Sequence, residues 1–432
     1  MTEVPEPPDE AREERAKEAE IEPGTGEAAQ EPRTGGDYAP SVAERLAFYQ
    51  RAGGIITPVL TALIAFLIGG LVVLASGSNP LSTYRAIFNG TGLNWLFPWV
   101  TGNDRVLAAL NLQQTLLLTT PLILCGLAVA FAFRCGMFNI GGQGQYLVGT
   151  ITGVWVGSSF LNMNGGLHIV LTILVAMLAG AAWGGIAGFL KATVGAHEVI
   201  TTIMLNWIAV WVGSWVFQLG GPLQSHGQGG SVPVSNDVAQ KAHLPVFWGD
   251  PILQGLHIGF FVALAALVVY WIVLNRTTLG YEVRAVGFNP EAARYGGIAV
   301  RRNYFVAMAI SGLFAGLAGA IDVLGWEFRV GVNDIQISNI GFIAIAVALL
   351  GRNTAVGVFF SALLFGALLN GTSTRHLDPS VFRPDLAGNL TSIIQGLVVL
   401  FVGADVLVLW LWNLRRHLRV RKRAAGEAVT TT

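Results

Sequence analysis

The stretch LHIVLTILVAMLAGAAWGGIAGFL (residues 167–190) contains no Asp, Glu, Lys or Arg. A helix of about 20 apolar residues crosses the ~30 Å hydrocarbon core of a bilayer with its backbone hydrogen bonds made internally. The stretch also contains Gly180, Gly184, Gly185 and Gly188, and such small residues let neighbouring helices approach closely. It therefore predicts a membrane-spanning helix that packs tightly within a bundle.

The same pattern recurs along the chain. Hydrophobic residues make up 53% of the 432 residues and charged residues 12%, whereas a soluble domain carries about 25% charged residues. Hydropathy predicts about ten spans. They cover residues 55–76, 112–133, 145–162, 167–190, 201–219, 257–275, 303–325, 336–351, 355–372 and 389–414. We expect an all-α polytopic membrane protein with one transmembrane domain over residues 51–414.

The net charge of zero hides an uneven distribution of charged residues. Residues 1–50 contain thirteen Asp or Glu and five Lys or Arg, so the remainder, from totals of 26 each, holds thirteen acidic and 21 basic residues. The first 50 residues have too few apolar side chains to offset the entropy of ordering, and they lack the pattern of a secretory signal. They are predicted to form a disordered acidic tail.

Basic residues gather in the loop 276–302 and in the C-terminal tail 415–432. Because Lys and Arg accumulate on the cytoplasmic side of membrane proteins, both segments are predicted to be cytoplasmic. With ten spans, both termini then lie in the cytoplasm. The same register places the loop 220–256, whose only Lys or Arg is Lys241, outside.

The sequence lacks the residue patterns of several kinds of functional site. Cys125 and Cys135 have neither metal-ligand spacing nor a second pair, so they are predicted to be helix-packing residues, and no metal site is assigned. The segment GGQGQ (residues 141–145) lacks the Lys and Ser/Thr of a phosphate-binding loop, and no such motif occurs elsewhere. No HExxH, carboxylate pair or Cys/His nucleophile is present, which argues against a membrane enzyme.

The loop TTLGYEVRAVGFNPEAARYGGIAVRRN (residues 277–303) carries a capped helix signal. Asn289 can cap a helix, Pro290 suits its first turn, and Glu291 places negative charge near the positive end of the helix dipole. Gly296 and Gly297 then end the helix. From the residues alone, the segment is either an ordinary interfacial helix or a rigid lever between two spans.

The order of EAA, three residues and Gly297 resembles the coupling loop of ABC importer permeases. The stretches GYEVRAVGFNPEAARYGGI, FRCGMFNIGGQGQYLVG (133–149) and GAHEVITTIMLNWIA (195–209) are similar to segments of nucleoside and simple-sugar permeases, a group within the superfamily of branched-chain amino acid permeases. The resemblance covers roughly residues 55–412. The Leu-Pro ending of the longer coupling pattern is absent, which puts residue-by-residue transfer beyond Gly297 in doubt.

The resemblance implies a type II ABC importer bundle in a bacterial inner membrane. It implies a separate ABC ATPase that holds ATP and Mg, a second permease subunit that is a paralogue, and an external substrate-binding lipoprotein, with no cofactor on this chain and no nucleic-acid partner. The ATPase is expected to contact one set of residues: Arg284, Asn289, Pro290, Glu291, Ala292, Ala293, Tyr295 and Gly297. The implied cargo is a nucleoside, favouring purine nucleosides, with simple sugars as the alternative.

Uncharged polar residues near or within the predicted spans are candidates for the solute pathway. A glycine-rich break with amide side chains next to apolar spans is stable only where protein or a water-filled cavity satisfies its backbone, and broken helices of this kind form transport sites. Amides suit sugar hydroxyls and base edges. The candidates are Asn139, Gln143, Gln145, Thr202, Asn206, Asp322, Trp326 and Asn370.

Each candidate also has a simpler interpretation. The break at 139–145 could be a cytoplasmic turn, Thr202 and Asn206 could pair between helices, and Asp322 with Trp326 could mark the membrane interface. A secondary transporter driven by protons or sodium is the rival from another class. Such transporters tend to carry paired buried carboxylates and inverted repeats, whereas the spans here contain few acids.

Overall fold

The computed structural model of the chain describes residues 62–373, apart from 76, 228–230 and 250–254, together with 392–393, 396–397 and 400. Every described residue belongs to one unit of the chain, within Ala52–Thr432. Three predicted segments lie outside the described residues: the tail 1–50, the tail 415–432 and most of the span 389–414.

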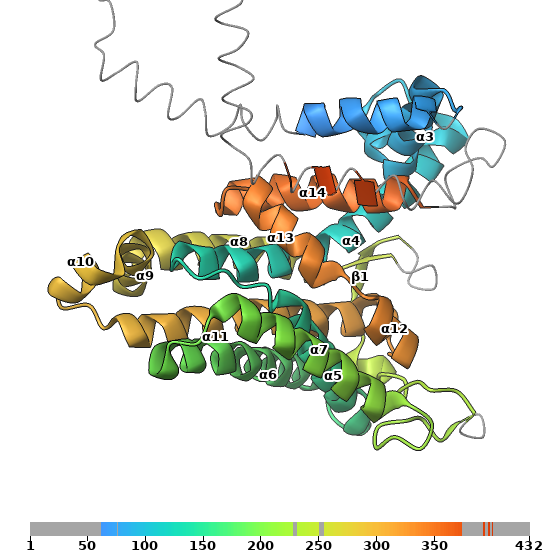
Figure 1. Cartoon of the computed structure of the whole chain (residues 1–432). Helices are drawn as coiled ribbons and strands as arrows, with labels where there is room; N and C mark the ends of the chain where they lie inside the picture. Colours follow the sequence, from blue (N-terminus) through green and yellow to red (C-terminus); the bar gives the residue numbers. More distant parts are fainter. Residues whose placement is uncertain are drawn as a thin grey trace, which may run out of the picture. The chain divides into compact units, whose positions relative to one another are not determined.

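Helices form most of the described part of the chain (Figure 1). In order, the elements are the helix Ala62–Ala75, α3 (Pro80–Thr91), η1 (Leu93–Leu96), α4 (Gly102–Arg134), α5 (Gly142–Ser159), α6 (Gly165–Val194), α7 (Glu198–Phe217), η3 (Gln240–Ala242), β1 (Val246–Trp248), β2 (Leu256–His257), α8 (Gly259–Arg276), α9 (Thr278–Phe288), α10 (Pro290–Tyr295), α11 (Val300–Asp322), the π-helical turn η5 (Val323–Glu327), α12 (Val332–Ile337), α13 (Ile340–Leu350) and α14 (Ala355–Gly371).

Six of these helical stretches are long and apolar enough to cross a membrane: α4, α6, α7, α8, α11 with η5, and α12 with α13. The helix Ala62–Ala75 and α14 are shorter apolar helices. Each predicted span from 112–133 to 355–372 overlaps a helix of the structure. The prediction of a polytopic helical membrane protein is therefore confirmed, and the count of ten spans stays a prediction.

The helix α3 was not predicted. Asn79 caps it by accepting a hydrogen bond from the backbone N–H of Leu81 at 2.9 Å, Pro80 starts it, and Gly92 ends it with φ of 73°. At Gly92 the backbone lies so close to α4 that a Cβ would come within 2.1 Å of the Leu112 nitrogen. Hydropathy missed α3 because twelve residues with several polar side chains do not resemble a span.

The interior of the bundle is built around α4, which contributes its whole second half, from Leu117 onward, as mostly buried side chains. The predicted close approach along α6 is confirmed. A Cβ at Gly180 would lie 2.3 Å from the Gly312 carbonyl oxygen, and one at Gly184 would lie 2.5 Å from that of Met308. The backbones of α6 and α11 are therefore in direct contact. Cys125 and Cys135 are free and buried, as predicted for packing residues.

The two long loops of the transmembrane domain lie at opposite ends of the helices (Figure 1). One end carries α9 and α10. The other end carries the loop between α7 and α8, in which Val246 and Trp248 of β1 pair with His257 and Leu256 of β2. The turn η5 supports this loop, because the Leu244 N–H donates to the Leu324 carbonyl at 2.8 Å.

Candidate functional site

The predicted helix at 289–297 is present as α10. The Asn289 side-chain oxygen accepts hydrogen bonds from the N–H groups of Glu291 and Ala292, both at 3.0 Å, and Pro290 is the first helical residue. Gly297 leaves the helix with φ of 82°, a conformation that favours glycine. The capping chemistry that the sequence predicted is therefore confirmed.

Large aromatic side chains flank α10 and point away from the bundle. Phe288 is 89% exposed and Tyr295 is 94% exposed. Glu291 pairs with Arg294 of the same helix at 3.4 Å, but both side chains are exposed, so this pair adds little stability. Ala293 is buried, so the face of α10 that carries it packs against the rest of the protein. Exposed aromatic side chains beside a rigid short helix form a surface suited to a protein partner.

The remaining predicted coupling residue, Arg284, lies elsewhere. It sits on α9 and lines a cavity with Arg134 and residues of α8 and of the turn before α14. It does not join Phe288, Glu291 and Tyr295 at the exposed tip. The structure thus separates the residues predicted to contact the ATPase into two groups. One group lies on or beside the exposed helix α10, and the other is Arg284, which lines a cavity beside α9.

The helix α9 connects the tip to the interior of the bundle. The Gly287 backbone rests on the end of α4, where a Cβ at Gly287 would lie 2.2 Å from the Arg134 carbonyl oxygen. Asn303 of α11 donates to the Glu282 carboxylate at 3.0 Å, which ties α9 to α11. A displacement of α10 must therefore be transmitted to the segment that follows α4.

That segment, residues 135–141, overlaps the predicted glycine-rich break at 139–145 only in part, because Gly142, Gln143, Gly144 and Gln145 form the first turn of α5. The chain leaves α4 at Cys135 and runs without regular structure to Gly141, the N-cap of α5. Asn139 is buried at its centre. Its side-chain nitrogen donates to Gln145 at 3.0 Å and to Ser311 of α11 at 2.7 Å, and its oxygen accepts from the Gly141 N–H at 2.8 Å.

Two further amides join this buried cluster. The Asn206 side chain of α7 accepts from the Gly144 N–H at 2.7 Å and donates to the Ile140 carbonyl at 2.9 Å. Gln143 donates to the Ser338 carbonyl at 2.9 Å and accepts from the Gly341 N–H at 2.8 Å. Both amides therefore satisfy carbonyl groups of the non-helical segments and free N–H groups in the first turns of α5 and α13.

Through Gln143, the break before α5 meets a second break, between α12 and α13. At this contact a Cβ on Gly341 would lie 2.3 Å from the Gln143 backbone. The buried Ser338 hydroxyl has no hydrogen-bond partner among the described residues. Two non-helical segments, residues 135–141 and 338–339, thus lie close to each other inside the bundle.

Thr202 is buried beside the cluster, with its side chain against Gly141, but its hydroxyl donates to the Glu198 carbonyl of its own helix at 2.8 Å. The predicted residues Asn139, Gln143, Gln145, Thr202 and Asn206 are therefore brought together. In this state their amides are paired with protein, and their predicted contact with solute stays a prediction.

Asp322 and Trp326 form a separate site at the end of α11. The Trp326 indole N–H donates to the Asp322 carboxylate at 2.6 Å, and the Tyr146 hydroxyl of α5 donates to its other oxygen. The side chains are held by the π-helical turn η5, in which Gly325 leaves room for His257, since a Cβ there would lie 2.2 Å from the His257 ring. His257 lies before α8, outside the spans, and burial lowers its pKa to about 4.

Asn370 lies apart from both groups. Its side-chain nitrogen, on α14, contacts the Asn111 carbonyl at 2.8 Å and the Gly90 carbonyl at 3.1 Å. It therefore joins α14 to α3 and to the beginning of α4. The sequence could not predict this placement, because α3 was not recognised as an element.

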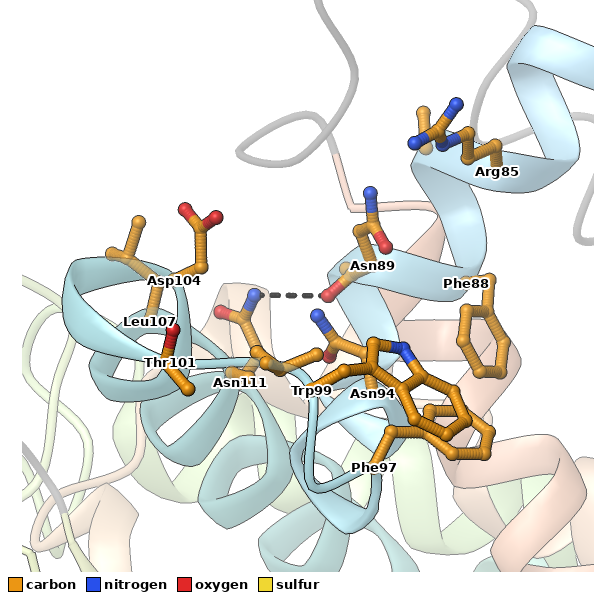
Figure 2. A pocket seen from close by; sticks show the side chains of 14 residues that line it. Arg85, Phe88, Asn89, Asn94, Phe97, Trp99, Thr101, Asp104, Leu107 and Asn111 are labelled. Atoms are coloured by element: carbon orange, nitrogen blue, oxygen red, sulfur yellow. Dashed lines mark hydrogen bonds between the residues drawn. The ribbon is translucent and has the colours of Figure 1, made fainter.

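A cavity of about 1040 Å³ lies between α3, η1 and the start of α4 (Figure 2). Its wall combines amides with a pair of stacked aromatic rings, Phe97 and Trp99, whose centroids are 4.6 Å apart. Asn111 donates to the Asn89 carbonyl at 3.2 Å across its floor. The Asn94 side-chain oxygen is buried and has no hydrogen-bond partner within the described ranges. Amides and exposed aromatic faces together suit a polar ring compound.

Sequence reasoning missed this cavity. The signal was present in the segment NGTGLNWLFPWVTGN (residues 89–103), where three aromatic residues and three asparagines interrupt the apolar pattern. A connector between two spans is usually short and polar, so several aromatic residues in one were the feature to notice.

Residues 111–403 match the protein family described as "Branched-chain amino acid transport system / permease component". The chain belongs to this family. The permease is 37% identical to the guanosine ABC transporter permease protein NupP of Bacillus subtilis (strain 168), over 83% of this chain and 96% of NupP. The permease is also 35% identical to the glucose ABC transporter permease protein TsgB13 of Haloferax volcanii, over 80% of this chain and 86% of TsgB13.

A second guanosine ABC transporter permease protein of the same Bacillus subtilis strain, NupQ, is 29% identical to the permease over 58% of this chain and 78% of NupQ. No solved structure matches the chain. The assignment of the chain to the family therefore depends on sequence similarity. The arrangement of α10 and of the non-helical segments 135–141 and 338–339 is known only from the structure described above.

Proposed function

We propose that the permease is the membrane subunit of an ABC importer that carries nucleosides, with ATP hydrolysis supplied by a separate ATPase. One observation carries the proposal: the exposed capped helix α10 is joined through the Gly287–Arg134 backbone contact to the segment 135–141, which holds the buried Asn139 and leads to Gln143 on α5. A partner that moves α10 therefore acts on the interior without touching it.

The ATPase is proposed to bind α10 with its groove around Phe288, Glu291 and Tyr295. ATP-driven closure would then favour one of two bundle states, outward-open or inward-open, each stabilised by its own contacts. The orientation that this requires has α9 and α10 in the cytoplasm, the loop 220–256 outside, and both termini inside with ten spans in a bacterial cell membrane. The Arg-rich composition of 276–302 supports it.

The external cavity is the proposed entrance for solute. It lies on the same side as the Trp95–Trp248 contact between η1 and β1, whose ring centroids are 5.4 Å apart. On the proposed orientation, a substrate-binding lipoprotein would release solute to this side. The solute would then pass to the buried cluster of Asn139, Gln143 and Asn206, with Asp322 and Trp326 lining the outer part of the pathway and Asn370 supporting the cavity floor.

Nucleosides are favoured as cargo because NupP is named for guanosine, and simple sugars remain the second candidate because TsgB13 is named for glucose. Nucleosides and sugars share hydroxyl groups that amides can bind, and a nucleoside adds a flat aromatic base that can stack on Phe97 and Trp99. The existence of NupP and NupQ in one strain supports a second, paralogous permease subunit as partner.

Uptake of labelled guanosine by cells that lack only this chain tests the proposal, with and without the gene restored. Unlabelled nucleosides, bases, glucose and ribose are added as competitors. We expect restored uptake that nucleosides inhibit. Glu291→Lys should insert into the membrane and abolish solute-stimulated ATPase activity of the assembled complex, whereas transport by the purified permease on an ion gradient alone would refute the proposal.

A further inference from the structure

A second cavity, of about 300 Å³, lies between α8, α9 and the turn that precedes α14. Two arginines, Arg134 and Arg284, line it together with Tyr270, Trp271 and Asn353. The charged and the apolar side chains of its wall come from different elements. The guanidinium groups come from the end of α4 and from α9, and apolar side chains come from α8 and the first turn of α14.

The positive charge in this cavity is not neutralised by the protein. Neither Arg134 nor Arg284 forms an ion pair within the described part of the chain. The Arg134 Nε–H donates to the Asn353 carbonyl at 2.9 Å, and the Arg284 Nε–H donates to the Gly280 carbonyl at 3.2 Å, so main-chain oxygens orient both planar groups. Two half-buried cations that line one cavity without a counterion favour the binding of an anion.

The turn that closes the cavity adds a free acceptor. Asn353 has φ of 53°, an uncommon conformation for a residue other than glycine, and its carbonyl also accepts a hydrogen bond from the Tyr270 hydroxyl at 2.9 Å. Its side-chain oxygen is buried and has no partner in the described ranges. A ligand with both an anionic group and a hydroxyl would satisfy the arginines and this oxygen together.

The position of the cavity indicates that the ligand is a lipid. Trp271 is 45% exposed, and the Arg276 guanidinium lies 5.3 Å from its ring, a combination typical of the membrane–water interface. Val268, Val269 and Ile272 of α8 and Val356 of α14 are exposed next to it and would face acyl chains. A free anion in water would not need such apolar walls.

We propose that this cavity binds the headgroup of an anionic phospholipid, with Arg134 and Arg284 on the phosphate and Asn353 on a headgroup hydroxyl. The assignment of this cavity to the cytoplasmic leaflet rests on the orientation given under Proposed function. The existence of the lipid site does not rest on that orientation. Basic pockets between membrane helices bind phosphate headgroups in this way. Because α9 forms one wall, the lipid would hold the coupling segment against the membrane.

The test uses the full-length permease purified without its ATPase, so that lipid binding is measured separately from transport. Protein is reconstituted into nanodiscs of phosphatidylcholine with or without phosphatidylglycerol, and lipids retained after detergent extraction are counted by native mass spectrometry. We expect retention of phosphatidylglycerol in the native protein and about tenfold weaker retention in Arg134→Gln and in Arg284→Gln.

Arg301→Gln, which removes the same charge from an exposed position on α11 outside the cavity, is the matched control and should retain the lipid. Equal retention in all four proteins would overturn the proposal. Displacement of phosphatidylglycerol by millimolar inorganic phosphate would overturn the lipid assignment in favour of a site for soluble phosphate. Failure of guanosine uptake alone would leave lipid retention unchanged and would instead count against the proposed function.

Discussion

Gly287 lies against the main chain of Arg134, so closely that a Cβ at 287 would come within 2.2 Å of the Arg134 carbonyl oxygen. This contact places α9 directly on the end of α4, at the start of the break that leads to α5. The two elements are 153 residues apart in sequence. On the proposed coupling mechanism, this contact is the route by which a displacement of α10 would reach the buried amides.

Gly287→Ala should therefore weaken coupling. The added methyl group must push α9 away from α4, and we expect guanosine uptake to fall about tenfold while the protein still reaches the membrane. Gly296→Ala is the control, because a Cβ there meets no atom closer than 3.4 Å and φ is −74°. Equal uptake by the two variants, in vesicles with matched amounts of protein, would contradict this prediction.

Tyr295→Ala tests the tip. The side chain is 94% exposed, so its removal should change the unfolding temperature of the isolated permease by less than about 1 °C. If the ATPase packs on it, co-purification of the ATPase should fall and solute-stimulated ATPase activity should decrease severalfold. Tyr281→Ala, also exposed but on α9, provides the comparison. A normal yield of complex from Tyr295→Ala would remove this residue from the interface.

Asn206→Leu should lower stability as well as transport. The substitution leaves the Gly144 N–H and the Ile140 carbonyl buried without partners, at about 1–3 kcal/mol for each group. Thr202→Val removes only a hydroxyl that bonds to its own helix, and it should cost less than about 1 kcal/mol. Unfolding of the purified protein in detergent measures the loss of stability in both variants. Similar midpoints for the two variants would show that Asn206 does not support the break.

Trp99→Ala examines the external cavity. Trp99 is 73% exposed and stacks on Phe97, so the change should not affect folding. We expect a rise of about fivefold in the KM for guanosine uptake, with a smaller effect on glucose, because the stacked face suits a base. Leu96→Ala, equally exposed but outside the cavity lining, is the control. An unchanged KM would indicate that solute bypasses this cavity.

His257 predicts a pH dependence of folding. Burial lowers its pKa to about 4, whereas an unfolded histidine has a pKa of about 6.5. Between these values the unfolded chain takes up a proton that the folded protein does not, so stability falls as the pH decreases from about 6.5 to about 4, by a total of about 3 kcal/mol. In His257→Gln this part of the decrease should disappear from unfolding curves recorded at pH 7.5 and 4.5. The same pH dependence in both proteins would show that His257 is accessible.

The sequence predicted features that depend on local chemistry. Apolar blocks placed the helices from α4 to α14, and Asn289 and Pro290 placed the start of α10, because a span or a cap is encoded by adjacent residues. It could not predict that Gln143 would bridge to Ser338 and Gly341, or that Asn370 would contact Asn111, because such pairs are set by packing between distant helices. It missed α3 and the cavity beside it because hydropathy treats a short polar helix as a connector.

The direct backbone contact between Gly180 and Gly312 has a mechanical consequence. Carbonyl groups and Cα atoms that touch across two helices leave no side-chain layer in which one helix could slide past the other. The helices α6 and α11 therefore move together as one rigid body. The helix α11 begins five residues after α10 ends, so a force on α10 is transmitted along the α6–α11 pair through the bundle. The hinges of a transport cycle therefore lie outside these two helices.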